Sequence, residues 1–128
     1  MADFDKAFEK TILKEGGYVK DKDDRGGETF MGISRVHHPN SLIWMIVDKV
    51  TAKYTKISDI NRELKKDKEL IALVKSIYKS DYWSPFNLNK EKSQRLAEHI
   101  FDSAVNTGIT NTRKMLQRVK NEMEMFKK

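Results

Sequence analysis

The chain has 128 residues, of which 38% are hydrophobic and 34% are charged, and its formal net charge is +6. A chain of this length predicts one domain, and its longest apolar run, LIWMIV, is far shorter than the roughly 20 residues that cross a membrane. The absence of cysteine excludes disulfides and thiolate metal sites, while the positive charge indicates an anionic partner or simply keeps the surface soluble.

The first predicted element is a helix that starts after Asp3, a plausible N-cap, and ends at Gly16. Along it, Phe8 and Ile12 belong to a series of apolar residues at the spacing of one helical face. Short extended runs then flank an Asp- and Gly-rich turn in residues 18–34, which predicts a small irregular β-hairpin.

Two further helices are expected in the middle of the chain. Residues 42–50 hold six consecutive apolar residues, which also suit a buried strand, but their charged flank and a cap from Asn40 or Ser41 favour a helix. Residues 66–83 have apolar side chains at three- and four-residue steps, and this helix is expected to break at Ser84-Pro85. The stretch SPFNLN that follows is expected to be a loop.

The last part of the chain is predicted to form two helices, residues 92–108 and 110–126, that meet at Gly108. Their inward-facing residues are expected to be Leu96, Ile100 and Val105 in the first helix and Met115, Leu116, Val119 and Met123 in the second. The predicted fold class is mainly α with one small β-hairpin after the first helix, a class that includes lysozyme-like folds. We expect a single domain over residues 1–128, in which residues 85–128 form a C-terminal helical segment packed on residues 1–84.

Glu15 is the leading candidate for an acid-base residue. It is expected at the C-terminal end of the first helix, where the negative end of the helix dipole disfavours a carboxylate and raises its pKa. A general acid that works near neutral pH needs a carboxyl group that keeps its proton. Gly16 and Gly17 leave room for a bulky substrate next to it. The alternative for an isolated glutamate at such a position is an ordinary exposed side chain.

A second group of polar residues follows in the sequence DKDDRGGET. If the first helix and the hairpin pack together, the Asp24 carboxylate and the Thr29 hydroxyl face Glu15 across a groove. Glycoside hydrolysis needs such a set, because a carboxylic acid protonates the leaving oxygen while a second group serves the opposite face of the sugar. A solvated turn or a calcium loop is the alternative, although the spacing of a calcium loop is missing. The acids that can replace Asp24 if the register differs by a turn are Asp21, Asp23 and Glu28.

These residues carry a resemblance to a known family. The stretch EGGYVKDKDDRGGETFMGIS resembles the signature of glycoside hydrolase family 108, the phage-type endolysins and bacterial N-acetylmuramidases. The resemblance continues at IYKSDYW, residues 77–83, and then at FDSAVNTG and Leu116-Gln117, which are similar to the adjoining peptidoglycan-binding-like segment. The family usually continues after its Leu-Gln with an Asp-Gly turn and more helix, so the C-terminal segment of this chain is expected to be truncated.

The resemblance implies a lysozyme-like fold with Glu15 as the catalytic acid. It also implies that Asp24 and Thr29 position the attacking water or stabilise the charged transition state, as in the Glu, Asp, Thr triad of phage-type lysozymes. No cofactor and no metal are expected, because a zinc-binding pattern is missing from the three histidines, His37, His38 and His99.

Aromatic side chains are candidates for sugar binding, because sugars stack on rings through their apolar faces. The substrate-binding residues that we expect are Gly16, Gly17, Tyr18, Phe30, Tyr82 and Trp83. Trp44 lies inside an apolar run and is expected in the core instead. Asp102 and Asn106, four residues apart on one helix face, are expected to be buried and to satisfy turn amides near the hairpin, and the alternative is a direct part in the chemistry.

The implied function is that of a peptidoglycan hydrolase, a lysozyme or N-acetylmuramidase that cuts the β-1,4 bond between N-acetylmuramic acid and N-acetylglucosamine by general acid catalysis. The alternatives are an inactive lysozyme-like protein that binds the cell wall and a basic helical module that binds nucleic acid. By analogy with phage-type lysozymes, we expect inversion at the anomeric carbon.

We expect a monomer whose partner is the glycan strand of peptidoglycan, with no nucleic-acid partner and no stable insertion into a membrane. The first ten residues, MADFDKAFEK, lack the basic leader and the apolar core of a signal peptide. A phage or prophage endolysin of this kind is expected to stay in the host cytoplasm until a holin, a membrane pore from another gene, gives it access to the wall.

Overall fold

The computed structural model describes residues 1–13, 17–20 and 27–127. The chain divides into two compact units: one contains Met1–Ala7 together with Lys79–Lys128, and the other contains Phe8–Tyr78. We call the first the terminal unit and the second the central unit. The expected single domain with an internal boundary after residue 84 stays a prediction.

The first helical stretch has the buried face that the sequence predicts. α1 spans Phe4–Phe8 and continues as a π-helical turn, η1, over Glu9–Leu13. Its buried side chains are Phe4, Ala7, Phe8 and Ile12. The predicted end of this helix at Gly16 lies outside the described residues.

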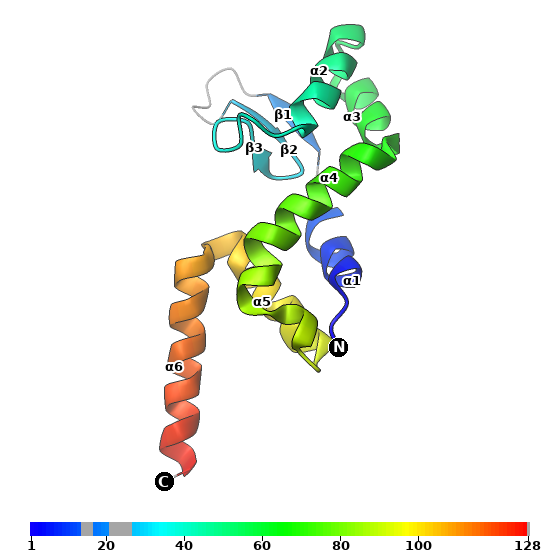
Figure 1. Ribbon diagram of the computed structural model, residues 1–128. Helices are drawn as coiled ribbons and strands as arrows, with labels where there is room; N and C mark the ends of the chain where they lie inside the picture. The colour runs from blue at the N-terminus through cyan, green and yellow to red at the C-terminus, as the bar shows by residue number, and fades with distance from the viewer. Residues whose placement is uncertain (14–16, 21–26, 128) are drawn as a thin grey trace. The chain divides into compact units, whose positions relative to one another are not determined.

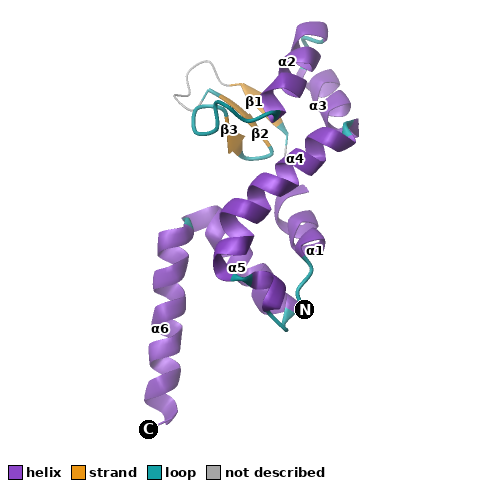
Figure 2. Cartoon of the chain, viewed as in Figure 1, coloured by secondary structure: helices purple, strands orange, loops and turns teal. Residues whose placement is uncertain are grey.

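The predicted hairpin is present as part of a three-stranded antiparallel sheet, drawn in orange in Figure 2. Its strands are β1 (Tyr18–Lys20), β2 (Glu28–Phe30) and β3 (Ile33–Ser34), in the order β1-β2-β3. The pairing of β2 with β3 was not predicted. A two-residue turn joins these strands, because Phe30 is paired directly with Ile33.

Three helices complete the central unit (Figure 1). α2 spans Ile43–Lys53, which confirms the helix over the alternative strand. α4 spans Lys68–Tyr78 and confirms the second long amphipathic helix. α3, Ile57–Lys66, was not predicted, and it contacts α2, α4 and β1. The unpredicted helix is therefore one of the elements that connect the sheet to the rest of the unit.

The ends of these helices agree only in part with the prediction. The N-cap residue of α2 is Leu42, not the predicted Asn40 or Ser41, and its side chain makes no capping hydrogen bond. The Ser41 hydroxyl nevertheless accepts a hydrogen bond from the Ile43 amide, the first amide of the helix, at 3.3 Å. After α4 the chain continues as a π-helical turn, η2, over Lys79–Trp83. The α- and π-helical path ends at Trp83, next to the predicted break at Ser84-Pro85, and a 3-10 turn follows that holds Pro85 in its first turn, where the missing amide hydrogen is tolerated.

In the terminal unit, the predicted loop SPFNLN contains two short 3-10 turns instead of irregular chain. They are η3 (Ser84–Phe86) and η4 (Leu88–Lys90). Asn87 between them has a left-handed backbone with φ 53°, a conformation that asparagine tolerates better than most residues. The Trp83 indole donates a hydrogen bond to the Asn89 side chain at 2.6 Å, which anchors the second turn.

An aromatic cluster forms the core of the terminal unit. Phe4, Trp83 and Phe101 pack edge to face, with ring centroids 5.4, 5.7 and 5.7 Å apart. Pairs of this kind contribute about 0.5–1.5 kcal/mol each beyond the area that they bury. The cluster therefore joins the first residues of the chain to its C-terminal part.

Two helices follow, as predicted. α5 spans Gln94–Thr107 and α6 spans Ile109–Lys127, and they contact each other. Gly108 separates them with φ 93°, a backbone conformation that favours glycine. In Figure 1 the two helices are the segments drawn from yellow to red.

The buried faces of these helices differ from the prediction. Ile100 is buried as predicted, and Val105, Met115 and Leu116 are half-buried. The residues that were expected to face inward but are exposed are Leu96, Val119 and Met123. The buried face of α5 runs instead through Ala97, Ile100, Phe101 and Ala104. The predicted and observed faces share Ile100, whereas Leu96 and Val105 lie at the two edges of the observed buried stripe instead of inside it.

Asp102 and Asn106 are exposed, so the prediction of a buried pair that satisfies turn amides is wrong. The Asn106 amide donates to the Asp102 carboxylate at 3.0 Å and to the Asp102 backbone carbonyl at 2.9 Å. The two side chains thus interact with each other on the surface of α5.

The predicted fold class is confirmed, since the described residues are mainly helical and carry one small antiparallel sheet after the first helix, consistent with a lysozyme-like fold. None of the helices in the described part of the chain is long and apolar enough to cross a bilayer.

Candidate functional site

Most of the predicted catalytic residues fall in two stretches outside the described residues. They are Glu15, Asp24 and the two alternatives to Asp24, which are Asp21 and Asp23; the predicted substrate-binding residue Gly16 lies there as well. The description resumes at Gly17 after the first stretch and at Gly27 after the second. The described part of the site consists of the residues that flank these stretches.

Asn61 of α3 fixes the backbone that follows Glu15 in the chain. The Asn61 side-chain carbonyl accepts a hydrogen bond from the Tyr18 amide at 2.7 Å. The same oxygen lies 3.2 Å from the place that a β-carbon on Gly17 would occupy, so a larger residue there would have to displace it. The Gly17 carbonyl in turn accepts a hydrogen bond from the Met31 amide at 3.2 Å. Two separate elements thus hold the start of β1.

Replacing Asn61 with alanine is expected to lower the free energy of unfolding by about 1–3 kcal/mol, because the part-buried Tyr18 amide loses its acceptor. Asn61→Asp keeps an acceptor oxygen and is expected to lower the free energy of unfolding by a smaller amount. Urea unfolding of the wild type and both variants measures the difference. Equal stability of Asn61→Ala and the wild type would contradict the role given to Asn61.

Thr29 occupies the middle of β2, the central strand of the sheet. It pairs with Val19 of β1 and with Ser34 of β3. Since alternate residues of a strand point to opposite faces, Thr29 lies on the face opposite Glu28 and Phe30. Val19 is exposed and Thr29 is half-buried, so the predicted site hydroxyl lies on the more accessible face of the sheet.

A series of hydrogen bonds crosses the other face of the sheet and reaches α2. The Tyr18 hydroxyl donates to one Glu28 oxygen at 2.5 Å, and the Arg35 guanidinium donates to the other at 2.9 Å. Arg35 also binds Asp48 of α2 through two bonds of 2.7 and 2.9 Å. Its guanidinium lies 5.3 Å from the centroid of the Trp44 ring, a cation–π distance. Both Glu28 oxygens are engaged, which favours a structural role for this carboxylate.

These contacts shift the titration of their members. Burial and the hydrogen bond to Glu28 raise the pKa of the Tyr18 hydroxyl, so this group stays protonated. The hydrogen bonds from Arg35 lower the pKa of the Asp48 carboxyl, so this group stays ionised, and the same bonds raise the pKa of Arg35. The sheet is thus joined to α2 through a charged ion pair.

The ion pair of Arg35 with Asp48 is expected to make stability depend on acidic pH. Because folding lowers the pKa of Asp48, the pair stabilises the protein above the unfolded value of about 3.9, and this contribution is lost as the pH falls through the folded value. In urea unfolding, the stability difference between the wild type and Asp48→Asn should stay constant from about pH 7 to 5 and shrink below about pH 4.

An Arg35→Met background provides the control for this pH dependence. Asp48 has no guanidinium partner there and keeps only the opposing effects of burial and Lys20 on its pKa, so the stability change caused by Asp48→Asn should depend much less on acidic pH. A wild-type difference that also stays constant down to low pH would contradict the role of the pair.

The turn between β2 and β3 is held by the last residue of α4. Met31 and Gly32 have φ values of 48° and 81°, and two positive values in a two-residue loop are typical of a type I′ turn. The Tyr78 hydroxyl donates a hydrogen bond to the Met31 carbonyl at 2.5 Å. It also lies 2.6 Å from the place that a β-carbon on Gly32 would occupy, so only glycine fits there without a shift.

A polar cleft of about 440 Å³ opens beside the sheet on the Glu28 side. Its polar lining includes Tyr18, Lys20, Glu28, Asp48, Thr51 and Tyr54. Thr29 points to the opposite face and does not line it. Among the residues that the structure describes, no group of three or more His, Asp or Glu side chains is placed to hold a metal ion.

A family model described as glycosyl hydrolase 108 matches residues 8–108, which is more than half of the chain. The chain belongs to the glycosyl hydrolase 108 family. This confirms the resemblance found in the sequence and makes the protein a member of a glycoside hydrolase family. No curated protein and no solved structure matches the chain. The matched residues include Glu15, Asp24 and Thr29, whereas α6 lies beyond them.

The aromatic residues that were expected to bind sugar in this glycosyl hydrolase 108 protein differ in accessibility. Phe30 and Trp83 are buried at 0% exposure, so no face of either ring is open to a sugar in this structure. Tyr82 is half-buried in η2, and Tyr18 is buried but lines the polar cleft. Trp44 lies in the core, as predicted.

Three residues that hold this part of the glycosyl hydrolase 108 chain in place were missed by sequence reasoning: Arg35, Asp48 and Asn61. Arg35 and Asp48 are 13 residues apart in different elements, and Asn61 is 43 residues from Tyr18. No local pattern connects residues at such distances. The one available signal was the position of Asn61 directly after Ile60, beside the buried stripe of a helix that was not recognised.

Proposed function

We propose that this protein is a peptidoglycan hydrolase, a lysozyme or N-acetylmuramidase that cleaves the β-1,4 bond between N-acetylmuramic acid and N-acetylglucosamine. The observation that carries the proposal is the match to the glycosyl hydrolase 108 family over residues 8–108. The stretch EGGYVKDKDDRGGETFMGIS, which resembles the family signature, lies inside that match. A phage or prophage endolysin that lyses the host cell is the biological role that the resemblance favours.

In the proposed reaction, Glu15 donates its proton to the glycosidic oxygen. Glu15 follows the helical turn η1 by two residues, and the negative end of a helix favours the protonated form of a nearby carboxyl group. As the bond to the leaving sugar breaks, positive charge builds up on the remaining ring, and a water molecule attacks its anomeric carbon from the opposite face. Asp24 and Thr29 are proposed to hold this water or to stabilise the charge, with inversion as the outcome.

The described residues around Glu15 support a site of this kind. A catalytic group must be held to within about 0.5 Å by its surroundings. The hydrogen bond that Asn61 accepts from Tyr18 and the one that Met31 donates to Gly17 fix the backbone two and three residues after Glu15. The proposal therefore combines an acid supplied by the family signature with a rigid strand directly after it.

We propose the glycan strand of peptidoglycan as the partner and a monomer as the working form, without nucleic acid and without stable membrane insertion. The net charge of +6 suits this partner, because cell walls carry peptide carboxylates and often teichoic phosphates. The enzyme would remain in the host cytoplasm until a holin opens a path to the wall.

Digestion of purified peptidoglycan tests the proposal. The full chain is incubated with insoluble peptidoglycan, and the released fragments are reduced with borohydride and identified by mass spectrometry. Reduced muramic acid at the new chain ends is the expected result. Reduced glucosamine ends would contradict the proposed bond while keeping glycosidase activity.

The same samples identify the alternative functions. An inactive wall-binding protein would sediment with peptidoglycan and release no fragments. A nucleic-acid-binding module would retard DNA in a gel and would neither sediment with the wall nor release fragments. Either result would overturn the proposed hydrolase.

A further inference from the structure

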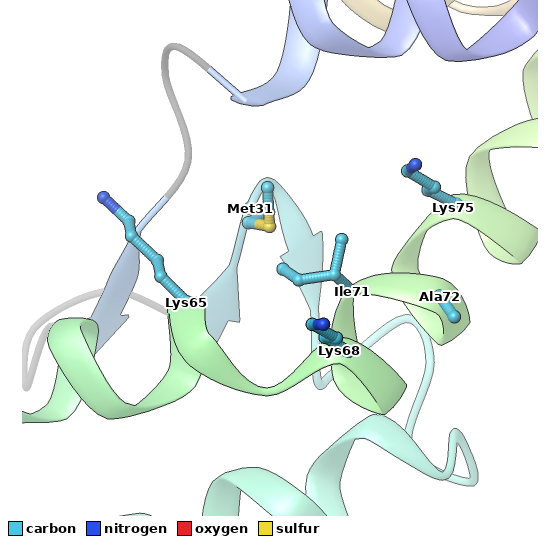
Figure 3. A pocket seen from close by; sticks show the side chains of 6 residues that line it. All are labelled: Met31, Lys65, Lys68, Ile71, Ala72 and Lys75. Carbon is cyan, nitrogen blue, oxygen red and sulfur yellow. The ribbon is translucent and has the colours of Figure 1, made fainter.

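A second cavity of about 440 Å³ lies in the central unit (Figure 3), and its described lining residues all differ from those of the polar cleft. Its lining residues are Met31, Lys65, Lys68, Ile71, Ala72 and Lys75. Three of them are apolar, three are lysines, and none is acidic among the residues that the structure describes. We call this cavity the lysine groove.

The lysines flank an apolar floor. Ile71 extends toward Met31 in Figure 3, and Lys65 and Lys75 lie on opposite sides of this apolar pair. On α4, Lys68, Ile71 and Lys75 are spaced at three- and four-residue steps, which places them along one face of the helix. The groove therefore offers a small apolar surface with an ammonium group at each end.

Two of the three lysines of the groove have no carboxylate partner among the described residues. Lys65 and Lys68 are exposed and pair with no carboxylate in the described part of the chain, whereas the neighbouring Lys66 lies 3.7 Å from Glu63. The Lys75 ammonium lies 5.6 Å from the centroid of the Phe8 ring. Cationic groups around a hollow with low-dielectric walls concentrate anions from solution. A fitting ligand therefore carries several negative charges and small apolar groups between them.

The groove is connected to the segment that carries Glu15. Met31, its innermost residue at 2% exposure, donates its amide hydrogen to the Gly17 carbonyl at 3.2 Å. The Tyr78 hydroxyl bonds to the carbonyl of the same methionine and fixes the turn. A ligand seated on Met31 would thus lie one hydrogen bond from the strand that follows the proposed catalytic acid.

We propose that the lysine groove binds the acidic stem peptide of peptidoglycan, with the peptide carboxylates at Lys65 and Lys68 and the alanine methyl groups on Met31 and Ile71. The inference rests on the proposed function, because the stem peptide is attached to the muramic acid residue next to the bond proposed to be cut. A teichoic polyol phosphate carries the charge but has no apolar groups for the floor of the groove, so it fits less well.

Kinetics on soluble, uncrosslinked glycan strands test this role. The strands are compared with their stem peptides intact and after an amidase has removed them. The Lys65→Gln/Lys68→Gln variant is expected to raise KM about 3- to 30-fold on strands with stems, to leave kcat unchanged, and to leave both constants unchanged on bare strands. Lys49→Gln/Lys53→Gln, which removes two exposed lysines from α2, is the matched control and should leave every constant unchanged.

Binding of the free peptide gives a readout that does not depend on catalysis. The probe is a synthetic tripeptide of L-alanine, γ-linked D-glutamate and L-lysine, and the control probe is the same peptide with its carboxylates amidated. The Met31 methyl resonance, assigned with Met31→Leu, should shift with the acidic peptide and not with the amidated one. An oligomer of glycerol phosphate should shift it less at equal concentration.

The two measurements separate this inference from the proposed function. The stem-peptide role would be overturned if Lys65→Gln/Lys68→Gln raised KM equally on strands with and without stem peptides. It would also be overturned if the control variant Lys49→Gln/Lys53→Gln raised KM by the same factor. In both cases the protein still cleaves peptidoglycan, so the proposed hydrolase would stand. If the protein cleaves no peptidoglycan but its Met31 signal shifts with the acidic peptide, the stem-peptide site in the lysine groove stands and the proposed hydrolase is overturned. A stronger response to glycerol phosphate would overturn the choice of ligand.

Discussion

Glu15→Gln is expected to lower the rate of peptidoglycan cleavage by about 10²- to 10⁴-fold, because glutamine keeps the shape of the side chain and cannot donate a proton to the leaving oxygen. The rate is measured as the release of reducing ends from purified peptidoglycan. Glu9→Gln is the matched control, since Glu9 is an exposed glutamate of η1 six residues earlier. The control should keep the wild-type rate within about twofold.

The outcomes of this comparison have separate meanings. A Glu15→Gln protein that cuts as fast as the wild type would exclude Glu15 as the acid and leave the hydrolase in place. If Glu15→Gln and Glu9→Gln lowered the cleavage rate equally, the lower rate would come from the lost negative charge in this part of the chain and not from the lost proton donor. Thermal unfolding of each variant confirms that the compared proteins are folded.

Gly32→Ala is expected to lower the free energy of unfolding by about 2–4 kcal/mol. Part of this cost, about 1–2 kcal/mol, comes from a side chain at the positive φ of 81°. The rest comes from the new β-carbon, which would lie 2.6 Å from the Tyr78 hydroxyl and disturb its buried hydrogen bond to Met31. Urea unfolding followed by circular dichroism measures the loss.

Two further variants separate the contributions. Gly27→Ala has a similar φ of 64°, and among the described residues its β-carbon would meet Val36 alone, at an ordinary 3.7 Å, so this substitution should cost the backbone share of about 1–2 kcal/mol. In a Tyr78→Phe background the hydroxyl is gone and the nearest ring atom would be 4.0 Å away, so Gly32→Ala should cost the same smaller amount. Equal losses in all three cases would contradict the close contact with Tyr78.

Elements whose ends are marked by local chemistry could be predicted from the sequence. Gly108 separates α5 from α6, and Pro85 marks the point where the long path through η2 gives way to a 3-10 turn, because glycine permits and proline restricts particular backbone conformations wherever they occur. The hairpin was predicted for the same reason, from glycines and acids between two extended runs. The third strand was not, because a Met-Gly pair is an uncommon type I′ turn.

Features that depend on tertiary packing could not be predicted with the same success. Val119 and Met123 recur at helical spacing, but the spacing alone does not tell whether another element covers them, and both are exposed. Ala97 and Ala104 are small, so the pattern of large residues pointed to Leu96 instead of the true buried face. α3 was missed because only Ile57, Ile60 and Leu64 mark it among charged residues.

The residues of the candidate site also fall into a group that the sequence could predict and a group that it could not. The sequence alone indicated Glu15, Asp24 and Thr29, because catalytic residue types in a family signature are a local pattern. The residues that hold their surroundings in place, such as Asn61 and Arg35, act through contacts between distant elements. No periodicity or spacing in one sequence records such contacts.

The ring contact between Phe8 and Tyr78, with centroids 6.0 Å apart, brings together the first and last residues of the central unit. The terminal unit is thus made from two separate pieces of chain, and the central unit is inserted between them with its own two ends close together. Phe4 and Trp83 are about eighty residues apart along the chain, but a folded insertion shortens the loose chain between them roughly tenfold. Closing the shorter loop costs about 2 kcal/mol less entropy. The aromatic core of the terminal unit therefore gains stability from the folding of the insertion through chain connectivity alone.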